Sequence, residues 1–443
     1  MRRAASETAA DGVGVRLSSE PRLQEEPREG VPEVTDTLDG FREACDRLAA
    51  GSGSLAADAE RASGYRYGHE DWLVQFKRTG SGIVLLDPIA LNKAGANWNE
   101  FNRAVGDATW IIHDSLQDLP GFTDLCMKVR NLFDTEIAAR LLGLKRFGLA
   151  AVTEHYLGIT LAKEHSAADW SYRPLPRDWR NYAALDVELL IELEAKMRAD
   201  LKKAGKMEWA NEEFSHALAE GTGPQPGHPV PWMRISHFTA LGHDRRGQAV
   251  AKALWEKRDE LACEHDIAPT LLLSDAAIIE AAQKKPHNAR QFRAIRSLNE
   301  RVRIHMGNEQ DKMFERYAPI QRSIKPSVWK DTIQQALKLK PKDWPEPPAP
   351  PQEAQANAPR SMKYWSVHHP DRFSRLKKVR AVIAQIAEDT RTPPDVVIKP
   401  QIIRNLCWQD NAAELDIPEF LREQGARQWQ IALVSESVSR VII

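Results

Sequence analysis

The chain has 443 residues, enough for roughly two to four domains, and its 42% hydrophobic and 28% charged residues are typical of a soluble globular protein. The formal net charge of −1 indicates no partner, but residues 35–215 are net acidic and residues 225–345 net basic, an asymmetry that hints at nucleic acid. The sequence contains no apolar run of membrane-spanning length, and its first residues lack the apolar core of a signal peptide. We therefore expect no membrane association.

The four cysteines, Cys45, Cys126, Cys263 and Cys407, are far apart and show no spacing typical of metal ligands. We interpret them as reduced core residues. Reduced thiols are the rule inside the cell, so the sequence predicts a cytoplasmic protein.

The first half of the chain predicts a disordered tail followed by an α/β domain. Residues 1–34 are rich in Glu, Arg, Pro, Ser and Gly and have few large apolar side chains. Short connections join the first three of the strands that we predict, which favours an antiparallel meander. The strands are expected at 54–62, 72–78, 82–87, 109–113 and 132–135, and helices at 38–48, 98–105, 136–142, 149–157 and 177–204. Strands that first meander and then alternate with helices indicate a mixed sheet, in a domain that we place at 35–220.

The second half of the chain predicts two small all-helical domains separated by linkers. Residues 221–232 and the Pro-rich residues 345–362 have linker composition. The helical domains are then 233–344 and 363–443. Their predicted helices are 245–266, 273–284, 288–305, 373–389, 400–408 and 418–423.

The two helical regions resemble each other in sequence. Pro269 aligns with Pro394, Leu272 with Val397 and Ile278 with Ile403. We interpret this as a duplicated helical module, and chance similarity of two amphipathic helix pairs is the alternative.

An acidic pair ends the first predicted strand, Leu55-Ala56-Ala57-Asp58-Ala59-Glu60. Residues two apart on a strand point to the same face, so Asp58 and Glu60 stand side by side. Two adjacent carboxylates repel each other unless a cation lies between them, and Mg²⁺ and Mn²⁺ prefer oxygen ligands. The alternative is an edge strand with a solvated acidic face.

Further candidate residues follow in three segments. The first segment is His113-Asp114-Ser115-Leu116-Gln117-Asp118-Leu119. Asp118 lies at a predicted helix start after a strand, where α/β folds place ligands. Asp114 lies in the turn and is better suited to capping a helix or to facing solvent. In the second, Tyr182 and Asp186 share one helix face, as metal-site residues or as a surface pair. The third segment contains Lys163, Trp170 and Arg173, residue types that bind phosphate or stack on bases, or that form a packed loop.

Together these motifs resemble the three exonuclease motifs of the DEDD superfamily, in its tyrosine variant, and their order and flanks resemble ribonuclease D. The resemblance rests on Asp58-x-Glu60, His113-x-x-x-x-Asp118-Leu119, Asp134-Thr135 after Phe133, the segment Leu161 to Leu175, and Tyr182-x-x-x-Asp186. One departure is Arg61-Ala62 after the first motif, where the best-known members have an aromatic residue. The helical regions resemble HRDC (helicase and RNase D C-terminal) domains.

The resemblance implies a ribonuclease H-like exonuclease domain and two HRDC-type domains, with two Mg²⁺ or Mn²⁺ ions held by Asp58, Glu60, Asp118 and Asp186. It implies 3′→5′ removal of nucleotides from RNA, with tRNA 3′ maturation as the expected process. Asp58 would bridge both ions, Glu60 and Asp186 would hold the water-activating ion, and Asp118 would act on the other ion through water. Tyr182 would orient the attacking water. His113, Lys163, Trp170 and Arg173 are candidate substrate contacts.

The expected partner is a structured, tRNA-like RNA with a free 3′ end, bound by a monomer. Basic clusters of the first helical region are candidate phosphate contacts, or solvated helix faces: Arg245-Arg246, Lys284-Lys285 and Arg293, Arg296, Arg301 and Arg303. The alternative functions are a 3′→5′ DNA exonuclease and a catalytically weak RNA-binding protein.

Overall fold

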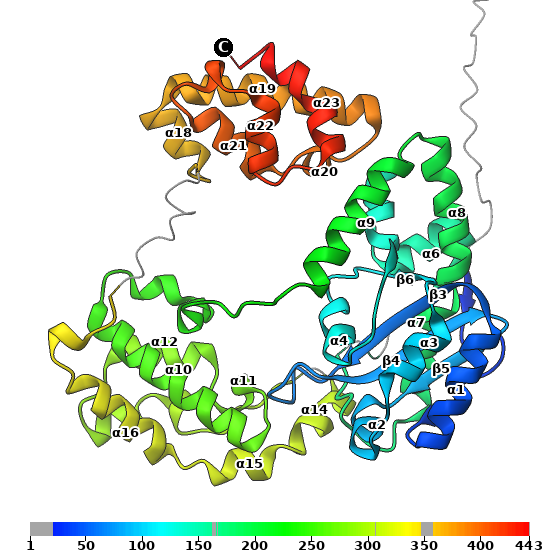
Figure 1. Cartoon of the computed structure of the whole chain (residues 1–443). Coiled ribbons are helices and arrows are strands. Elements are labelled where there is room, and N and C mark those ends of the chain that lie inside the picture. Colours follow the sequence, from blue (N-terminus) through cyan, green and yellow to red (C-terminus); the bar gives the residue numbers. More distant parts are fainter. Residues whose placement is uncertain (1–20, 162–164, 166, 306, 347–357, 443) are drawn as a thin grey trace, which may run out of the picture.

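The computed structural model describes residues 21–161, 165, 167–305, 307–346 and 358–442. It contains an α/β domain (21–222), a first helical domain (231–343) and a second helical domain (358–442), each with its own apolar core (Figure 1). The predicted substrate contact Lys163 lies outside the described residues.

The α/β domain is built on a mixed six-stranded sheet of order β2-β5-β4-β3-β6-β7, which confirms the predicted fold class. The three strands β3, β4 and β5 pair antiparallel, and the pairs β3–β6, β6–β7 and β2–β5 are parallel. The strands are β1 (Arg22–Gln24), β2 (Val34–Thr35), β3 (Ser52–Arg61), β4 (Asp71–Thr79), β5 (Gly82–Leu86), β6 (Thr109–Ile112), β7 (Asn131–Asp134) and β8 (Ile159–Leu161).

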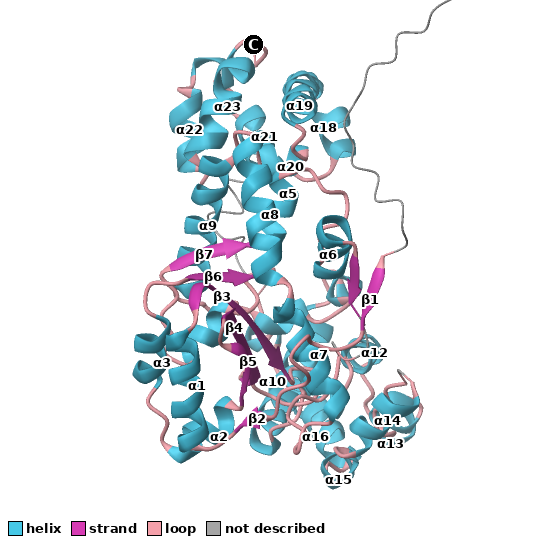
Figure 2. Ribbon diagram, turned by 90° about the vertical axis from the view of Figure 1, so that its right-hand side faces the viewer, coloured by secondary structure: helices cyan, strands magenta, loops and turns pink. Residues whose placement is uncertain are grey.

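Helices cover both faces of this sheet. Figure 2 shows α1 and α3 on one side of the central strands and α7 on the other. The helices of the α/β domain are α1 (Leu38–Ala50), α2 (Pro88–Ala94), α3 (Trp98–Val105), α4 (Leu119–Asp124), α5 (Thr135–Leu141), α6 (Leu149–Leu157), α7 (Arg177–Glu188), α8 (Leu190–Lys203) and α9 (Met207–Thr222).

The central parallel pair β3–β6 fixes where the acidic residues lie. Leu55 pairs with Trp110 and Ala56 with Ile111, and all four side chains are fully buried. Aromatic rings around Trp110 fill the core, with Phe76 and Phe122 at 5.6 and 5.2 Å between ring centroids. Because the apolar run is buried, the residues that follow it on β3 and β6 emerge together at one edge of the sheet.

The predicted disordered tail is wrong for residues 21–34. Strand β1 pairs with β8 in a separate two-stranded sheet, and β2 pairs with β5 at the edge of the main sheet. Hydrogen bonds to α7 hold this segment, from Asn181 Nδ2 to the Glu25 carbonyl at 2.7 Å and from Arg180 Nη1 to the Pro32 carbonyl at 2.9 Å. Composition failed here because the segment gains its order from long-range pairing rather than from a core of its own.

Three helix predictions also need correction. The predicted long helix 177–204 is two helices, α7 and α8, that meet at Leu189, so Asp186 lies near the end of α7 and not near a helix start. Residues 115–118 form turns, and α4 begins at Leu119. The predicted helix 288–305 is reduced to two short helices, because its apolar spacing reflects burial of individual side chains rather than a continuous helix face.

The first helical domain centres on a long helix, α10. Its helices are η1 (Pro231–Arg234), η2 (Phe238–Leu241), α10 (Arg245–His265), α11 (Pro269–Leu272), α12 (Asp275–Lys284), α13 (Ala289–Arg293), η3 (Arg296–Leu298), α14 (Asn308–Glu315), α15 (Ala318–Ser323), α16 (Pro326–Leu337) and η4 (Pro341–Asp343).

The second helical domain repeats the start of this arrangement and confirms the predicted duplication. Helices α10 and α19 both have 21 residues and end in left-handed caps, at Asp266 and Arg391, and four-residue helices then begin at Pro269 and Pro394. The helices of this domain are α18 (Met362–His368), α19 (Pro370–Thr390), α20 (Pro394–Val397), α21 (Pro400–Trp408), η5 (Ala412–Glu414), α22 (Ile417–Glu423) and α23 (Gln428–Ser439).

Two further expectations concern the cysteines and membranes. Cys45 and Cys407 are buried free thiols, but Cys126 and Cys263 are exposed, so only two of the four are core residues. Across the described ranges, no helix combines the length and apolarity that a membrane span requires.

Candidate active site

Three of the predicted carboxylates meet where β3 is crossed by α7. Asp58 and Glu60 share one face of β3, and Asp186 comes from α7. Each offers a ligand oxygen, and these oxygens all lie within 4.8 Å of one another. The i,i+2 spacing on the strand therefore produces the side-by-side pair that the sequence predicts, and α7 supplies the third carboxylate from a distant part of the chain.

The three carboxyl groups of this cluster have raised pKa values. Burial raises the pKa of Asp58 to about 7, although a hydrogen bond of 2.5 Å from Gln75 Nε2 to its Oδ2 opposes the shift. Burial, followed by the charges of Asp58, Asp186 and Asp118, raises the pKa of Glu60 well above its usual value. Burial and the charge of Asp58 likewise raise the pKa of Asp186. Adjacent buried carboxylates behave in this way when nothing positive lies between them.

A divalent cation fits this group. The available donors are carboxylate oxygens, the ligands that Mg²⁺ and Mn²⁺ prefer, and a cation among them would stabilise the ionised carboxylates against the burial and repulsion that raise their pKa values. The chemistry of the donor set thus favours a hard divalent metal at this position.

The fourth predicted carboxylate, Asp118, lies beside the group and is held by Arg61. Asp118 occupies the residue before α4 without capping the helix through its side chain. Its Oδ1 is 3.0 Å from Arg61 Nη2, and Arg61 Nε is 3.0 Å from Oδ1 of the buried Asp71. Arg61, which departs from the family pattern, therefore links the candidate metal ligand Asp118 to the buried Asp71.

A second aspartate, Asp134, shapes the turn that leads to Asp118. Its carboxylate accepts the backbone N–H groups of Asp114 and Ser115 at 3.3 and 2.7 Å and caps α5 through the N–H groups of Glu136 and Ile137. Asp114 itself has a left-handed backbone, with φ 62°, and does not cap a helix. The Asp134-Thr135 pair of the sequence motif is thus a support for the 113–118 turn.

Tyr182 lies against the cluster, one helical turn before Asp186. Burial, and then the charges of Asp186, Glu60 and Asp58, raise the pKa of its phenol, which is therefore protonated at neutral pH. Contact with this hydroxyl lowers the pKa of Asp186 in turn. The phenol can therefore donate a hydrogen bond at the acidic group.

The side chains of the described candidate substrate contacts bind to other residues of the protein. His113 Nδ1 lies 2.8 Å from Thr135 Oγ1. Trp170 is fully buried and packs 6.2 Å from the Tyr182 ring. The Arg173 guanidinium donates to Asp87 Oδ2 at 2.5 Å and to the backbone carbonyls of Trp170, Tyr172 and Trp72. These contacts favour a supporting role for all three residues.

Hydrogen bonds from Arg316 and Tyr317 to Asp169 form an interdomain clamp on the segment around Trp170. Sequence reasoning missed this clamp. Asp169 is fully buried and accepts hydrogen bonds from Ser171 N and Oγ, from Arg316 Nη1 at 2.8 Å and from the Tyr317 hydroxyl at 3.0 Å. The last two donors belong to the first helical domain. The aspartate next to a tryptophan is visible in the sequence, but its burial is not, and its partners lie almost 150 residues away along the chain.

The same helical domain holds the connection that follows Glu60. Tyr65 stacks on Phe314 with ring centroids 4.5 Å apart, and its hydroxyl donates to the Ala167 carbonyl at 2.9 Å. The Tyr65 carbonyl in turn accepts from Ala268 N at 2.8 Å. Segments next to Glu60 and Tyr182 are therefore both attached to the first helical domain.

Comparison with protein families gives three matches in chain order. A model described as 3′-5′ exonuclease matches residues 32–202, the HRDC domain model matches residues 247–309, and a model described as 3′ to 5′ exonuclease C-terminal domain matches residues 358–442.

Among curated proteins, ribonuclease D of Shewanella sp. (strain ANA-3) is 29% identical over 229 residues, which cover 51% of this chain and 58% of the relative. Ribonuclease D of Escherichia coli (strain K12) is 25% identical over 280 residues, covering 62% of this chain and 72% of the relative. The aligned part thus spans little more than half of the length of the first of these relatives.

Among solved structures, a protein from Bifidobacterium adolescentis is 68% identical, with a TM-score of 0.90 over 96% of this chain and 100% of that chain. E. coli RNase D, described as an exoribonuclease involved in structured RNA processing, has a TM-score of 0.58 at 20% identity over 93% of this chain and 98% of that chain, a likeness of fold. By these matches the chain contains a DEDD-type 3′-5′ exonuclease domain followed by an HRDC domain, and it is similar to curated ribonucleases D.

Proposed function

We propose that this protein is a 3′→5′ exoribonuclease that removes nucleotides one at a time from RNA ends, with tRNA-like precursors as substrates. The observation that carries the proposal is the convergence of Asp58, Glu60 and Asp186 within 4.8 Å, with Tyr182 against the group and Asp118 beside it. Ribonuclease D relatives support RNA as the substrate.

Two divalent ions, Mg²⁺ or Mn²⁺, are the proposed cofactors. When bound, such a pair stabilises the attacking and leaving oxygens of an in-line phosphodiester displacement. Asp58 would contact both ions, and Glu60 and Asp186 would hold the ion on the side of the attacking water. Asp118 would act on the ion of the leaving group through water, since its Oδ1 is engaged by Arg61.

Tyr182 is proposed to orient the attacking water. Its hydroxyl stays protonated because burial and the neighbouring carboxylates raise its pKa, so it can hold a water but cannot remove a proton from it. Its ring is packed by Trp170 and by His165, each 6.2 Å away between centroids. The packing fixes the direction in which the hydroxyl points, which is what orientation of a nucleophile requires.

The test is digestion of a 3′-labelled tRNA precursor by the purified full-length chain, with Mn²⁺, with Mg²⁺ and with EDTA. Metal-dependent release of single nucleotides from the 3′ end is the expected result. Faster digestion of single-stranded DNA would instead favour a DNA exonuclease, and RNA binding without metal-dependent hydrolysis would favour an RNA-binding protein. Size-exclusion chromatography with light scattering tests the expected monomer.

A further inference from the structure

Half of the basic cluster residues of the first helical domain are paired with carboxylates within the fold. Lys284 pairs with Glu280 at 2.6 Å, Lys285 with Asp244 at 2.5 Å, Arg296 with Glu300 at 3.1 Å and Arg301 with Glu315 at 2.7 Å. Arg245 and Arg246 donate to backbone carbonyls. A cation already paired with a carboxylate gains less from a phosphate, so these clusters are weaker RNA contacts than their number indicates.

The second helical domain has a denser cationic surface on α18 and the first half of α19, in which Arg372 pairs with Asp410. Residues 360–380 hold seven arginines and lysines against one aspartate: Arg360, Lys363, Arg372, Arg375, Lys377, Lys378 and Arg380, against Asp371. The aligned stretch of the first helical domain, 235–255, has three against one: Arg245, Arg246 and Lys252, against Asp244. Within this aligned stretch, the second copy of the module is therefore the more basic one.

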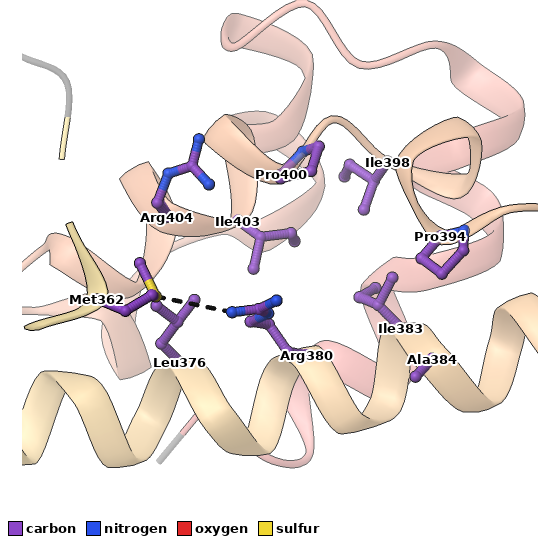
Figure 3. A pocket seen from close by; sticks show the side chains of 10 residues that line it. All are labelled: Met362, Leu376, Arg380, Ile383, Ala384, Pro394, Ile398, Pro400, Ile403 and Arg404. Carbon is purple, nitrogen blue, oxygen red and sulfur yellow. Dashed lines mark hydrogen bonds between the residues drawn. The ribbon is translucent and has the colours of Figure 1, made fainter. Parts of the chain in front are cut away.

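A pocket opens within this surface between α19, α20 and α21 (Figure 3). It has a volume of about 220 Å³, and its lining is mostly apolar: Met362, Leu376, Ile383, Ala384, Pro394, Ile398, Pro400 and Ile403, with Arg380 and Arg404. Figure 3 shows the Arg380 guanidinium among these apolar side chains, with the Met362 sulfur as its drawn partner at 3.7 Å.

The arginines of the pocket have no carboxylate partner among the described residues. Arg404 donates to the neutral Gln401 Oε1 at 3.1 and 2.6 Å, and the polar contact of Arg380 is with the Met362 sulfur. Arg380 and Arg404 line the same pocket, and burial, followed by the charges of Arg360 and Arg380, lowers the pKa of Arg404. Converging cations around an apolar floor are complementary to a ligand that is anionic and has a flat apolar part.

Aromatic side chains extend the same surface. Tyr364 is 43% exposed, with the His368 ring at 4.7 Å and the His369 ring at 5.7 Å. The His369 ring lies 4.6 Å from Trp408. Exposed rings interleaved with arginines are the usual means of holding single-stranded nucleic acid, because bases stack on the rings while cations contact the phosphates.

The surface has a fixed position relative to the active site. Trp429 of α23 stacks on Trp209 of α9 at 4.6 Å, and Lys206 Nζ donates to Thr392 Oγ1 at 2.9 Å. Figure 1 shows α18 at the end of the domain opposite this docked side. An RNA held there would therefore be held at a constant distance from the carboxylate cluster.

We propose that α18, the first half of α19 and α21 form a binding site for single-stranded RNA, in which Arg380 and Arg404 contact phosphates and the pocket receives an unstacked base. The site rests on the proposed RNA substrate. It would hold nucleotides upstream of the 3′ end that is being trimmed.

The test measures binding of a labelled oligoadenylate in EDTA, so that binding is separated from hydrolysis. Arg380→Gln with Arg404→Gln is expected to lower the slope of log K against log salt by about 1.4, since each phosphate contact of a single strand contributes about 0.7. At about 0.1 M salt this corresponds to roughly 25-fold weaker binding. The matched control, Arg293→Gln with Arg296→Gln in the first helical domain, should change both quantities far less.

A second variant pair tests the pocket without a change of charge. Ala384→Phe fills the pocket from α19 and should weaken oligoadenylate binding about tenfold, near the contribution of one seated base, at an unchanged salt slope. Ala381→Phe, one turn earlier and outside the pocket lining, is its control.

The outcomes separate this inference from the proposed function. Wild-type binding with an unchanged slope in Arg380→Gln/Arg404→Gln overturns the inference, as does an equal loss in the Arg293→Gln/Arg296→Gln control. Digestion of the tRNA precursor by the wild type is scored independently, so absence of hydrolysis would count against the proposed function while the binding titrations still decide on the surface.

Discussion

Removal of the donors that the first helical domain gives to Asp169 should loosen the segment that packs Tyr182. In the double variant Arg316→Met/Tyr317→Phe, the fully buried carboxylate keeps only the hydrogen bonds from Ser171. A hydrogen bond to a charged group contributes about 1.5–3 kcal/mol, and an uncompensated buried charge costs about 3–5 kcal/mol. Because Arg316 is partly exposed, we take the lower part of that range, about 3 kcal/mol, for the loss.

The assay is hydrogen exchange of the native protein, followed by mass spectrometry of peptides from residues 167–175. Since about 1.4 kcal/mol corresponds to a factor of ten, the local opening that exposes these amides should become about 10²-fold more frequent. The single-turnover rate on a short RNA should fall as well, because Trp170 then holds the Tyr182 ring less firmly. Substrate affinity should change little.

Two controls make the result specific. Arg322→Gln removes a charge from α15, the helix that follows Arg316 and Tyr317, without touching Asp169 and should leave exchange unchanged. Asp169→Leu combined with Arg316→Met/Tyr317→Phe removes the buried charge and should restore part of the protection. If exchange over residues 167–175 is the same in Arg316→Met/Tyr317→Phe as in the wild type, the clamp does not stabilise this segment and the reasoning is refuted.

Three further predictions concern the carboxylate cluster. Asp58→Asn should abolish RNA turnover and the Mn²⁺ binding that calorimetry measures. It should raise the melting temperature of the metal-free protein, because repulsion between like charges is reduced, and a lower melting temperature would contradict this. Tyr182→Phe should slow the single-turnover rate roughly 10²-fold at unchanged Mn²⁺ affinity, and a loss of RNA binding instead would make the residue structural. Arg61→Met with Asp71→Asn should tighten Mn²⁺ binding, because a guanidinium no longer occupies Asp118, and equal affinities in calorimetric titrations would count against that role.

The sequence by itself determined the features that depend on local pattern. Alternating and continuous apolar runs located β3, β4, β5, β6 and β7, and the i,i+2 pair Asp58 and Glu60 lies on one face of β3 because the period of a strand is fixed by its geometry. The duplicated module was also visible, since Pro269 and Pro394 begin equivalent short helices. These inferences need only neighbouring residues.

The tertiary structure decided every feature that depends on a distant partner. Residues 21–34 look disordered in composition but are ordered by pairing with β8 and β5. Arg173 and Asp169 have the residue types of substrate contacts or surface loops, yet the donors and acceptors around them come from other elements and from another domain. Lysines and arginines of the first helical domain form clusters in the sequence, but carboxylates brought near by folding pair with half of the eight cluster residues. A side chain's chemistry is written in the sequence, whereas its partner, and therefore its role, is set by which segments the fold brings together.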